Sequence, residues 1–293
     1  MALFQGAGVA LVTPFHNDGG VNFDALDALL THVLTGGADA LFACGTTGEP
    51  STMTTEERVN VISACVKKAK GKVPVFAGSG GNNTAEAIRF SQKCENLGVD
   101  GLLVVTPYYN KCTQNGAYAH YKAIAESVHI PMIAYNVPTR TGFNLAPATV
   151  ARLAELPNVR GIKEASGDID QMLEVARLIR GKMDFYSGDD SLTVPAMSIG
   201  AQGVISVAAN VIPDKMHEIT ALCFAGKYDQ AAQLAFTVYP FVKKLFCEVN
   251  PIPCKKALQF IGIDAGAPRM PLTEMEQEHA EALRAEMQKL KLL

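Results

Sequence analysis

Lys163 ends a short apolar sequence, Gly161-Ile162. If this segment is a strand of a barrel, its last side chain can point into the barrel mouth, where water is partly excluded. Desolvation disfavours the ammonium form of a lysine, and the neutral amine can attack a ketone to form a Schiff base. The resulting iminium would act as an electron sink. A solvated lysine at a strand end is the more common case, so this interpretation depends on the residues around it.

Hydroxyl groups that could transfer protons follow other apolar segments of the chain. Tyr135 ends one segment, and Tyr109 follows another. Thr46 and Thr47 follow a third. Schiff-base formation requires proton transfer to and from a carbinolamine, and a tyrosine hydroxyl can serve this purpose. Each tyrosine could instead be a half-buried packing residue, and the two threonines could form only a turn.

A guanidinium is available as well. Arg140 lies between Pro138 and Gly142, two residue types that shape a loop. Its guanidinium could bind a substrate carboxylate through two parallel hydrogen bonds. An arginine on an exposed loop is an equally good interpretation of this position.

Other kinds of site are poorly supported. The six histidines have neither HxxH nor HExxH spacing, which argues against a histidine metal site. The glycine-rich segment 78–83 lacks the third glycine of a dinucleotide-binding motif. No Gly-Lys pair is followed by Ser or Thr, as a phosphate-binding loop requires. We therefore expect neither a metal nor a nucleotide cofactor.

The composition predicts a globular protein, and we expect it in the cytoplasm, because its N-terminus lacks the charged region of a signal peptide. Of the 293 residues, 48% are hydrophobic and 19% are charged, which is typical of a chain that buries a large core. The net charge of −3 and the lack of a basic block predict no binding to nucleic acid. We expect no association with membranes, because no segment approaches the roughly 18 apolar residues that span a bilayer. The seven cysteines lack the spacing of a disulfide framework.

Apolar and helical segments alternate along most of the chain. Eight apolar segments span residues 8–13, 40–44, 73–77, 101–106, 131–135, 159–163, 184–187 and 203–207. A segment of helical periodicity follows each one, as the crossovers between parallel strands require. We therefore predict an α/β fold, a (β/α)8 TIM barrel, over residues 1–226. An open doubly wound sheet is the alternative, although it normally has fewer strands.

Residues 227–293 contain helical segments at 228–246, 253–261 and 273–290 and no predicted strand. Without a flexible linker before them, we expect a C-terminal helical extension that packs against the barrel. In a barrel, the carboxyl ends of all strands meet at one face. The fold would therefore bring Lys163, Tyr135 and Thr46 to the same mouth.

Five motifs resemble the dihydrodipicolinate synthase family: GTTGE at 45–49, YYNK at 108–111, YNVPTRTG at 135–142, GIKE at 161–164 and GVISV at 203–207. The similarity runs from residue 3 to near the C-terminus. It implies a condensation of pyruvate with L-aspartate 4-semialdehyde to 4-hydroxy-tetrahydrodipicolinate, the first committed step of diaminopimelate and lysine biosynthesis. Family members need no cofactor, because the Schiff base between the lysine and pyruvate supplies the chemistry. They are usually homotetramers, built as dimers of dimers.

The resemblance assigns the catalytic roles. Lys163 would form the Schiff base with pyruvate, and Tyr135 would donate and accept the proton. Thr46 and Tyr109 would relay protons, with Tyr109 reaching in from a neighbouring subunit.

The resemblance also assigns substrate contacts. Thr47 would bind the pyruvate carboxylate, and the backbone at Gly188 and Ile205 would border the pocket. Arg140 would hold the carboxylate of the semialdehyde. Related lyases that act on sialic acid and sugar acids generally lack this arginine, because their second substrate is a neutral aldehyde. Another pyruvate-dependent class I aldolase is therefore the alternative, and a non-catalytic binding or regulatory barrel is a remote third.

A regulatory site is implied by the same resemblance. Family members that L-lysine inhibits bind it at a subunit interface, and Asn82, Glu86 and Tyr108 match that site. Some sensitive members carry histidine where this chain has Thr55 and Arg58. Because Arg58 would place a cation near the ammonium groups of lysine, we expect feedback inhibition to be weak or absent.

Overall fold

The computed structural model describes residues 2–293, and within them eight parallel strands close into a barrel. The strands follow one another in chain order, and β8 pairs back to β1. They are β1 (Gly6–Ala10), β2 (Ala40–Ala43), β3 (Val75–Gly78), β4 (Gly101–Val105), β5 (Met132–Asn136), β6 (Val159–Glu164), β7 (Asp184–Ser187) and β8 (Gly203–Ser206). The predicted (β/α)8 barrel is confirmed, and the open doubly wound sheet is excluded.

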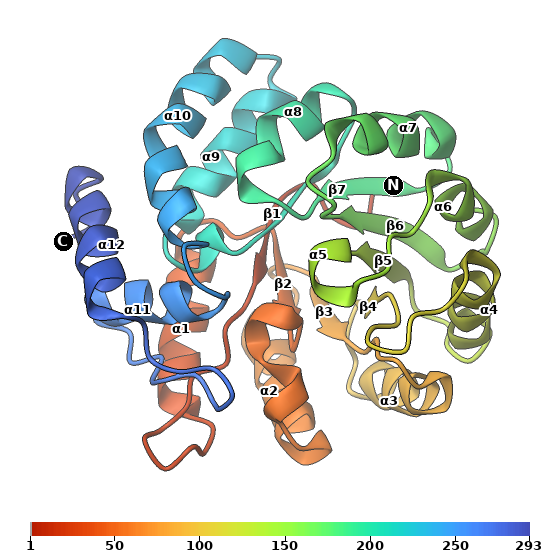
Figure 1. The fold of residues 1–293 in the computed structure, drawn as a ribbon, viewed down its shortest axis with the longest axis horizontal. Helices are drawn as coiled ribbons and strands as arrows, with labels where there is room; N and C mark the ends of the chain where they lie inside the picture. The colour runs from red at the N-terminus through yellow and green to blue at the C-terminus, as the bar shows by residue number, and fades with distance from the viewer. Residues whose placement is uncertain (1) are drawn as a thin grey trace.

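Helices surround the barrel and connect its strands (Figure 1). They are α1 (Phe23–Thr35), α2 (Thr55–Ala69), α3 (Thr84–Asn96), α4 (Gln114–Ala125), α6 (Pro147–Leu153), α7 (Ile169–Ile179), α8 (Thr193–Ser198) and α9 (Pro213–Phe224). Their starts follow simple capping chemistry. Asn22 caps α1 through its side chain, and Thr54 forms a capping box with Glu57 at the start of α2.

The first strand differs from its prediction. The apolar segment 8–13 suggested a strand there, but β1 spans Gly6–Ala10. Leu11 and Val12 are buried beyond the end of the strand, and the Val12 N–H donates to Asn210 Oδ1 instead of to a neighbouring strand. Apolar content therefore did not mark where the strand ends.

A helical extension follows the barrel, as predicted. It consists of α10 (Tyr228–Lys244), α11 (Ile252–Phe260) and α12 (Gln277–Lys289). Figure 1 shows these helices, in blue, on one side of the barrel. There α10 packs against α8, α9 and α12. Within residues 2–293, no helix is long and apolar enough to cross a membrane.

Two apolar layers hold the barrel together. The outer layer lies between strands and helices, and the inner layer fills the barrel with Phe4, Ala10, Ala40, Phe42, Phe76, Leu103, Ile133, Tyr135, Val137, Tyr186 and Ile205. Phe4, which precedes β1, stacks on Tyr186 with ring centroids 4.3 Å apart. Because aromatic rings fill the amino-terminal end of the barrel, space for a small molecule lies at the carboxyl ends of the strands.

Candidate active site

Lys163 lies in β6 with its side chain inside the barrel. Its neighbour Ile162 belongs to the outer layer, and a Cβ on Gly161 would contact Tyr186 of the inner layer. Because side chains alternate along a strand, Lys163 faces inward with Gly161. The residue is only 5% exposed, and its Nζ lies 4.4 Å from the centroid of the Tyr135 ring. The amine therefore lies within the barrel beside a phenol, away from bulk water.

Strand pairing fixes this arrangement. Tyr135 and Lys163 are register partners in β5 and β6, as are Asn136 and Glu164. The fully buried Glu164 carboxylate accepts from Asn136 Nδ2 at 3.0 and 3.1 Å and from the Ser166 N–H at 2.7 Å. Burial raises the pKa of Glu164, whereas these donors act in the opposite direction. This network ties together the two strand ends that carry Tyr135 and Lys163, and no sequence pattern predicts it.

Gly188 adjoins the lysine side chain. Its N–H donates to the carbonyl of Glu164 at 2.7 Å. A Cβ at this position would lie 3.0 Å from Lys163 Cε and 2.6 Å from Ala165 Cβ. Any residue with a Cβ at position 188 would therefore push the Lys163 side chain out of its present position.

Replacing Gly188 with alanine should displace the Lys163 side chain. If Lys163 is the nucleophile that the sequence predicts, kcat should fall by about 10²-fold, because a reacting group moved by about 1 Å loses its alignment. Steady-state kinetics would measure the loss. Gly81→Ala is the matched control, since no atom lies within 4 Å of a Cβ built there. Equal kcat values for the Gly188→Ala variant and the unmodified protein would show that the contact is unimportant.

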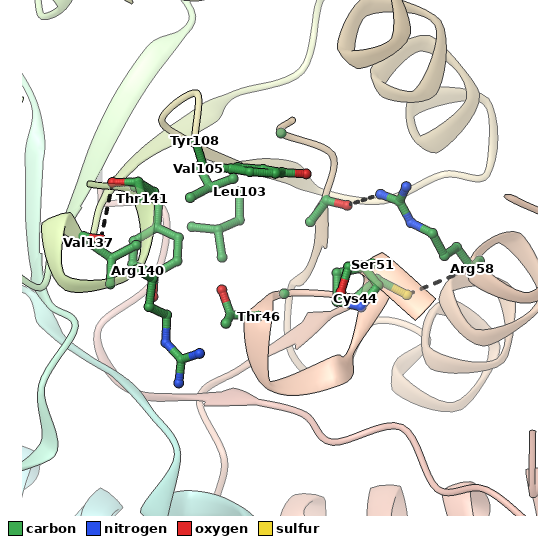
Figure 2. Close-up of a pocket in the computed structure, with 15 residues that line it drawn as sticks. Cys44, Thr46, Ser51, Arg58, Leu103, Val105, Tyr108, Val137, Arg140 and Thr141 are labelled. Carbon is green, nitrogen blue, oxygen red and sulfur yellow. Dashed lines mark hydrogen bonds between the residues drawn. The ribbon is translucent and has the colours of Figure 1, made fainter. Parts of the chain in front are cut away.

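A cavity of about 320 Å³, lined by both polar and apolar side chains, lies at the carboxyl ends of β2 to β5. Of the predicted site residues, Thr46, Tyr135, Arg140, Tyr108 and Arg58 line it. Figure 2 shows Arg140 and Arg58 on opposite sides of this cavity, with Thr46 between them. Tyr135 connects the cavity to the lysine, because its ring also contacts Lys163 Nζ.

Predicted residues that do not line this cavity include Lys163, Thr47, Gly188 and Ile205. Ile205 is buried in the inner layer, in register with Gly8 of β1. Contacts of these residues with a substrate stay a prediction.

Arg140 lies on a short helix, where its flanking proline and glycine predicted a loop. This helix, α5 (Pro138–Thr141), begins with a proline at its first position and ends at Gly142, whose φ of 67° suits glycine. Arg140 donates from Nη2 to the backbone carbonyl of Asn250 at 3.3 Å. The guanidinium is therefore oriented by a residue from the C-terminal part of the chain.

Asn250 also binds the threonine loop. Its Nδ2 donates to Oγ1 of Thr47 at 2.9 Å, and both residues are buried. Thr47 belongs to a 3-10 turn, η1 (Thr46–Gly48), that begins three residues after the end of β2. Asn250 therefore contacts two predicted substrate-binding residues, although the sequence offered only an NPIP motif at this position.

Tyr109 lies apart from the other candidates. It is 87% exposed, has a φ of 67° and does not line the cavity. Within one chain, Tyr109 is therefore not brought to Lys163. Its role as a residue supplied to a neighbouring subunit stays a prediction.

The four predicted effector residues share a second cavity. Asn82, Glu86, Tyr108 and Arg58 line this space of about 600 Å³ beside the first cavity. Arg58 donates from Nη2 to the carbonyl of Gly78 at 2.8 Å. Its guanidinium carbon also lies 3.6 Å from the centroid of the Phe90 ring. Burial lowers the pKa of Arg58, yet a guanidinium remains charged at neutral pH.

A closed (β/α)8 barrel with a pocket at the carboxyl ends of its strands has the architecture of a barrel enzyme. The chain matches the sequence model of the dihydrodipicolinate synthetase family over residues 3–290, and it belongs to that family. It is 50% identical over 284 residues to the 4-hydroxy-tetrahydrodipicolinate synthase of Clostridium novyi (strain NT), a match that covers 97% of this chain and 96% of the relative.

Solved structures agree with this assignment. The chloride-inhibited dihydrodipicolinate synthase from Acinetobacter baumannii, complexed with pyruvate, superimposes with a TM-score of 0.97 at 44% identity over 99% of each chain. The DHDPS from Cyanidioschyzon merolae with lysine bound has a TM-score of 0.97 at 37% identity over 100% of each chain. The fold and the family predicted from the sequence are therefore confirmed.

Proposed function

We propose that this protein condenses pyruvate with L-aspartate 4-semialdehyde to 4-hydroxy-tetrahydrodipicolinate, the first committed step of diaminopimelate and lysine biosynthesis. Membership of the family and the names of its relatives support this activity. The observation that carries the mechanism is the buried Lys163 amine, 4.4 Å from the centre of the Tyr135 ring inside the barrel. A ketone that enters the mouth would meet an amine and a proton donor together.

The reaction would begin at this amine. Lys163 attacks the ketone carbon of pyruvate, Tyr135 supplies a proton to the departing hydroxyl, and water leaves as the C=N bond forms. Loss of a methyl proton gives an enamine, whose carbon attacks the aldehyde carbon of the semialdehyde. The amino group of the second substrate then displaces Lys163 as the ring closes. The covalent intermediate itself supplies the electron sink, so no cofactor is required.

The other residues would relay protons and hold carboxylates. Thr46 lines the cavity with Tyr135, which suits a proton relay completed by Tyr109 of a neighbouring subunit. Thr47, held by Asn250, would bind the pyruvate carboxylate. Arg140 would bind the carboxylate of the semialdehyde at the cavity wall.

The choice of acceptor distinguishes this function from that of the related aldolases. We would compare aspartate semialdehyde with N-acetylmannosamine and glyceraldehyde as partners for pyruvate. For Arg140→Ala, we expect kcat/KM for the semialdehyde to fall by about 10²-fold or more, because a charge-assisted carboxylate contact is lost. A preference for either neutral aldehyde would instead support a sugar-acid or sialic acid lyase.

We further place the enzyme in the cytoplasm as a homotetramer. The 87% exposure of Tyr109 supports an assembly, because this residue is available to a neighbouring chain. Sedimentation of the purified protein at several concentrations would test the oligomeric state.

Feedback inhibition by L-lysine should be weak or absent. The Arg58 guanidinium is fixed by Gly78 and Phe90 at the wall of the second cavity, where it would repel a ligand ammonium group. Steady-state rates measured against L-lysine would test this expectation. Half-inhibition at micromolar L-lysine would contradict it. The variant Arg58→His removes the permanent cation and should be more sensitive than the parent.

A further inference from the structure

A buried ion pair joins the C-terminal extension to the loop that carries Thr46 and Thr47. Lys255 Nζ lies 2.6 Å from Oε1 of Glu49, and the two side chains are 1% and 3% exposed. Lys255 belongs to α11, and Glu49 directly follows the η1 turn. The ion pair therefore connects two parts of the chain that meet at the candidate active site.

The backbone of Glu49 is held in an unfavourable conformation. Its φ of 55° and ψ of 41° lie in the left-handed region, which residues with a Cβ avoid. Its N–H donates to the carbonyl of Thr46 at 3.2 Å and so closes the turn. A strained residue persists only where its surroundings hold it. Here Oε1 of the Glu49 carboxylate forms the ion pair with Lys255, and Oε2 accepts a hydrogen bond from the Arg269 N–H at 2.9 Å.

The Lys255 ammonium group is enclosed on its other sides. It lies 4.1 Å from the centroid of the Phe15 ring and 3.4 Å from the carbonyl of Ala267. Burial lowers the pKa of Lys255, and the nearby Glu49 carboxylate opposes this effect. The pair is thus sealed from water and does not line the catalytic cavity.

Stability alone is a poor reason for such a pair. Apolar residues of similar volume can often replace a buried ion pair without loss of stability, because both charges pay for desolvation. The pair fixes the end of the η1 turn, which contains Thr46 and Thr47. Thr46 lines the cavity, and Thr47 accepts a hydrogen bond from Asn250, which also comes from the C-terminal part of the chain.

We propose that Glu49 and Lys255 are positioning residues, which hold the η1 turn so that Thr47 meets the carboxylate of pyruvate and Thr46 keeps its place in the proton relay. Neither residue touches the substrate. This inference rests on the proposed function, because it assumes that Thr46 and Thr47 act on a pyruvate-derived intermediate.

The test separates positioning from stability by means of a double variant. Lys255→Met alone should lower Tm, because it leaves the Glu49 carboxylate buried without its partner. Glu49→Leu combined with Lys255→Met should regain most of the lost Tm. In this double variant we expect KM for pyruvate to remain raised by about tenfold or more and kcat to stay reduced, while KM for the semialdehyde changes by less than about threefold.

The matched control removes a neighbouring cation without touching the pair. Arg269 bonds Glu57 and lies over the same Phe15 ring, but it engages Glu49 only through its backbone N–H. Arg269→Met should therefore lower Tm and leave KM for pyruvate unchanged. If the double variant regains both the Tm and the pyruvate KM of the unmodified enzyme, the pair is only structural and the inference is overturned.

A second variant and a trapping experiment complete the test. Glu49→Gln keeps the side-chain volume, so it replaces the double variant if that protein does not fold; an unchanged pyruvate KM in Glu49→Gln would overturn the inference. Borohydride trapping of pyruvate on Lys163 in the unmodified enzyme tests the proposed function separately. An adduct there, together with a double variant that binds pyruvate normally, would mean that only the positioning role fails.

Discussion

Replacing Lys163 with alanine is expected to lower kcat by at least about 10⁴-fold, because the covalent route is lost with the nucleophile. The remaining contacts would bind pyruvate without forming the iminium. The rate of condensation with aspartate semialdehyde would be measured at saturating pyruvate. Lys163→Arg should be as inactive as Lys163→Ala, since a guanidinium stays charged and is not a nucleophile.

A surface lysine provides the control. Lys182 forms an exposed ion pair with Glu155 at 2.6 Å, with its side chain 55% exposed. Exposed pairs contribute little to stability, so Lys182→Ala should keep both activity and fold. If Lys163→Ala retained a tenth or more of the parent rate, Lys163 would not be the nucleophile.

Tyr135→Phe is expected to lower kcat by about 10² to 10⁴-fold, the usual contribution of a positioned proton donor. The substitution keeps the ring that lies against Lys163 Nζ and removes only the hydroxyl. KM for pyruvate should therefore change much less than kcat. Formation of the Schiff base, followed by rapid mixing and reduction, should slow by a similar factor.

Tyr228→Phe is the matched control for this substitution. The Tyr228 hydroxyl donates to the carbonyl of Met197 at 3.1 Å, outside the barrel and away from Tyr135. Its loss should cost about 1 kcal/mol of stability and leave kcat unchanged. Comparable losses of kcat in the two variants would show that Tyr135 acts through packing and not through its proton.

Much of the fold follows from patterns within short segments. Apolar strands and amphipathic helices alternate, and their number and order define the barrel without reference to distant contacts. The same reasoning placed Lys163 and Tyr135 at strand ends, and strand pairing brings them into register. Local sequence carries this information because side-chain alternation and strand order are properties of the segments themselves.

Contacts between distant residues could not be predicted in this way. Asn250 meets Thr47 across 203 positions, and Lys255 meets Glu49 across a similar span. No spacing rule relates residues this far apart, because the folding of the extension onto the barrel decides which of them meet. The predicted role of Tyr109 also depends on distant contacts, because a single chain leaves this residue exposed and only an assembly could bring it to a pocket.

The covalent intermediate is the central claim, and trapping tests it most directly. The purified enzyme would be incubated with pyruvate, reduced with borohydride and digested, and the adduct would be located by mass spectrometry. We expect irreversible inactivation that requires pyruvate, with a single reduced adduct on Lys163. An adduct on a different lysine, or inactivation without any adduct, would contradict the mechanism.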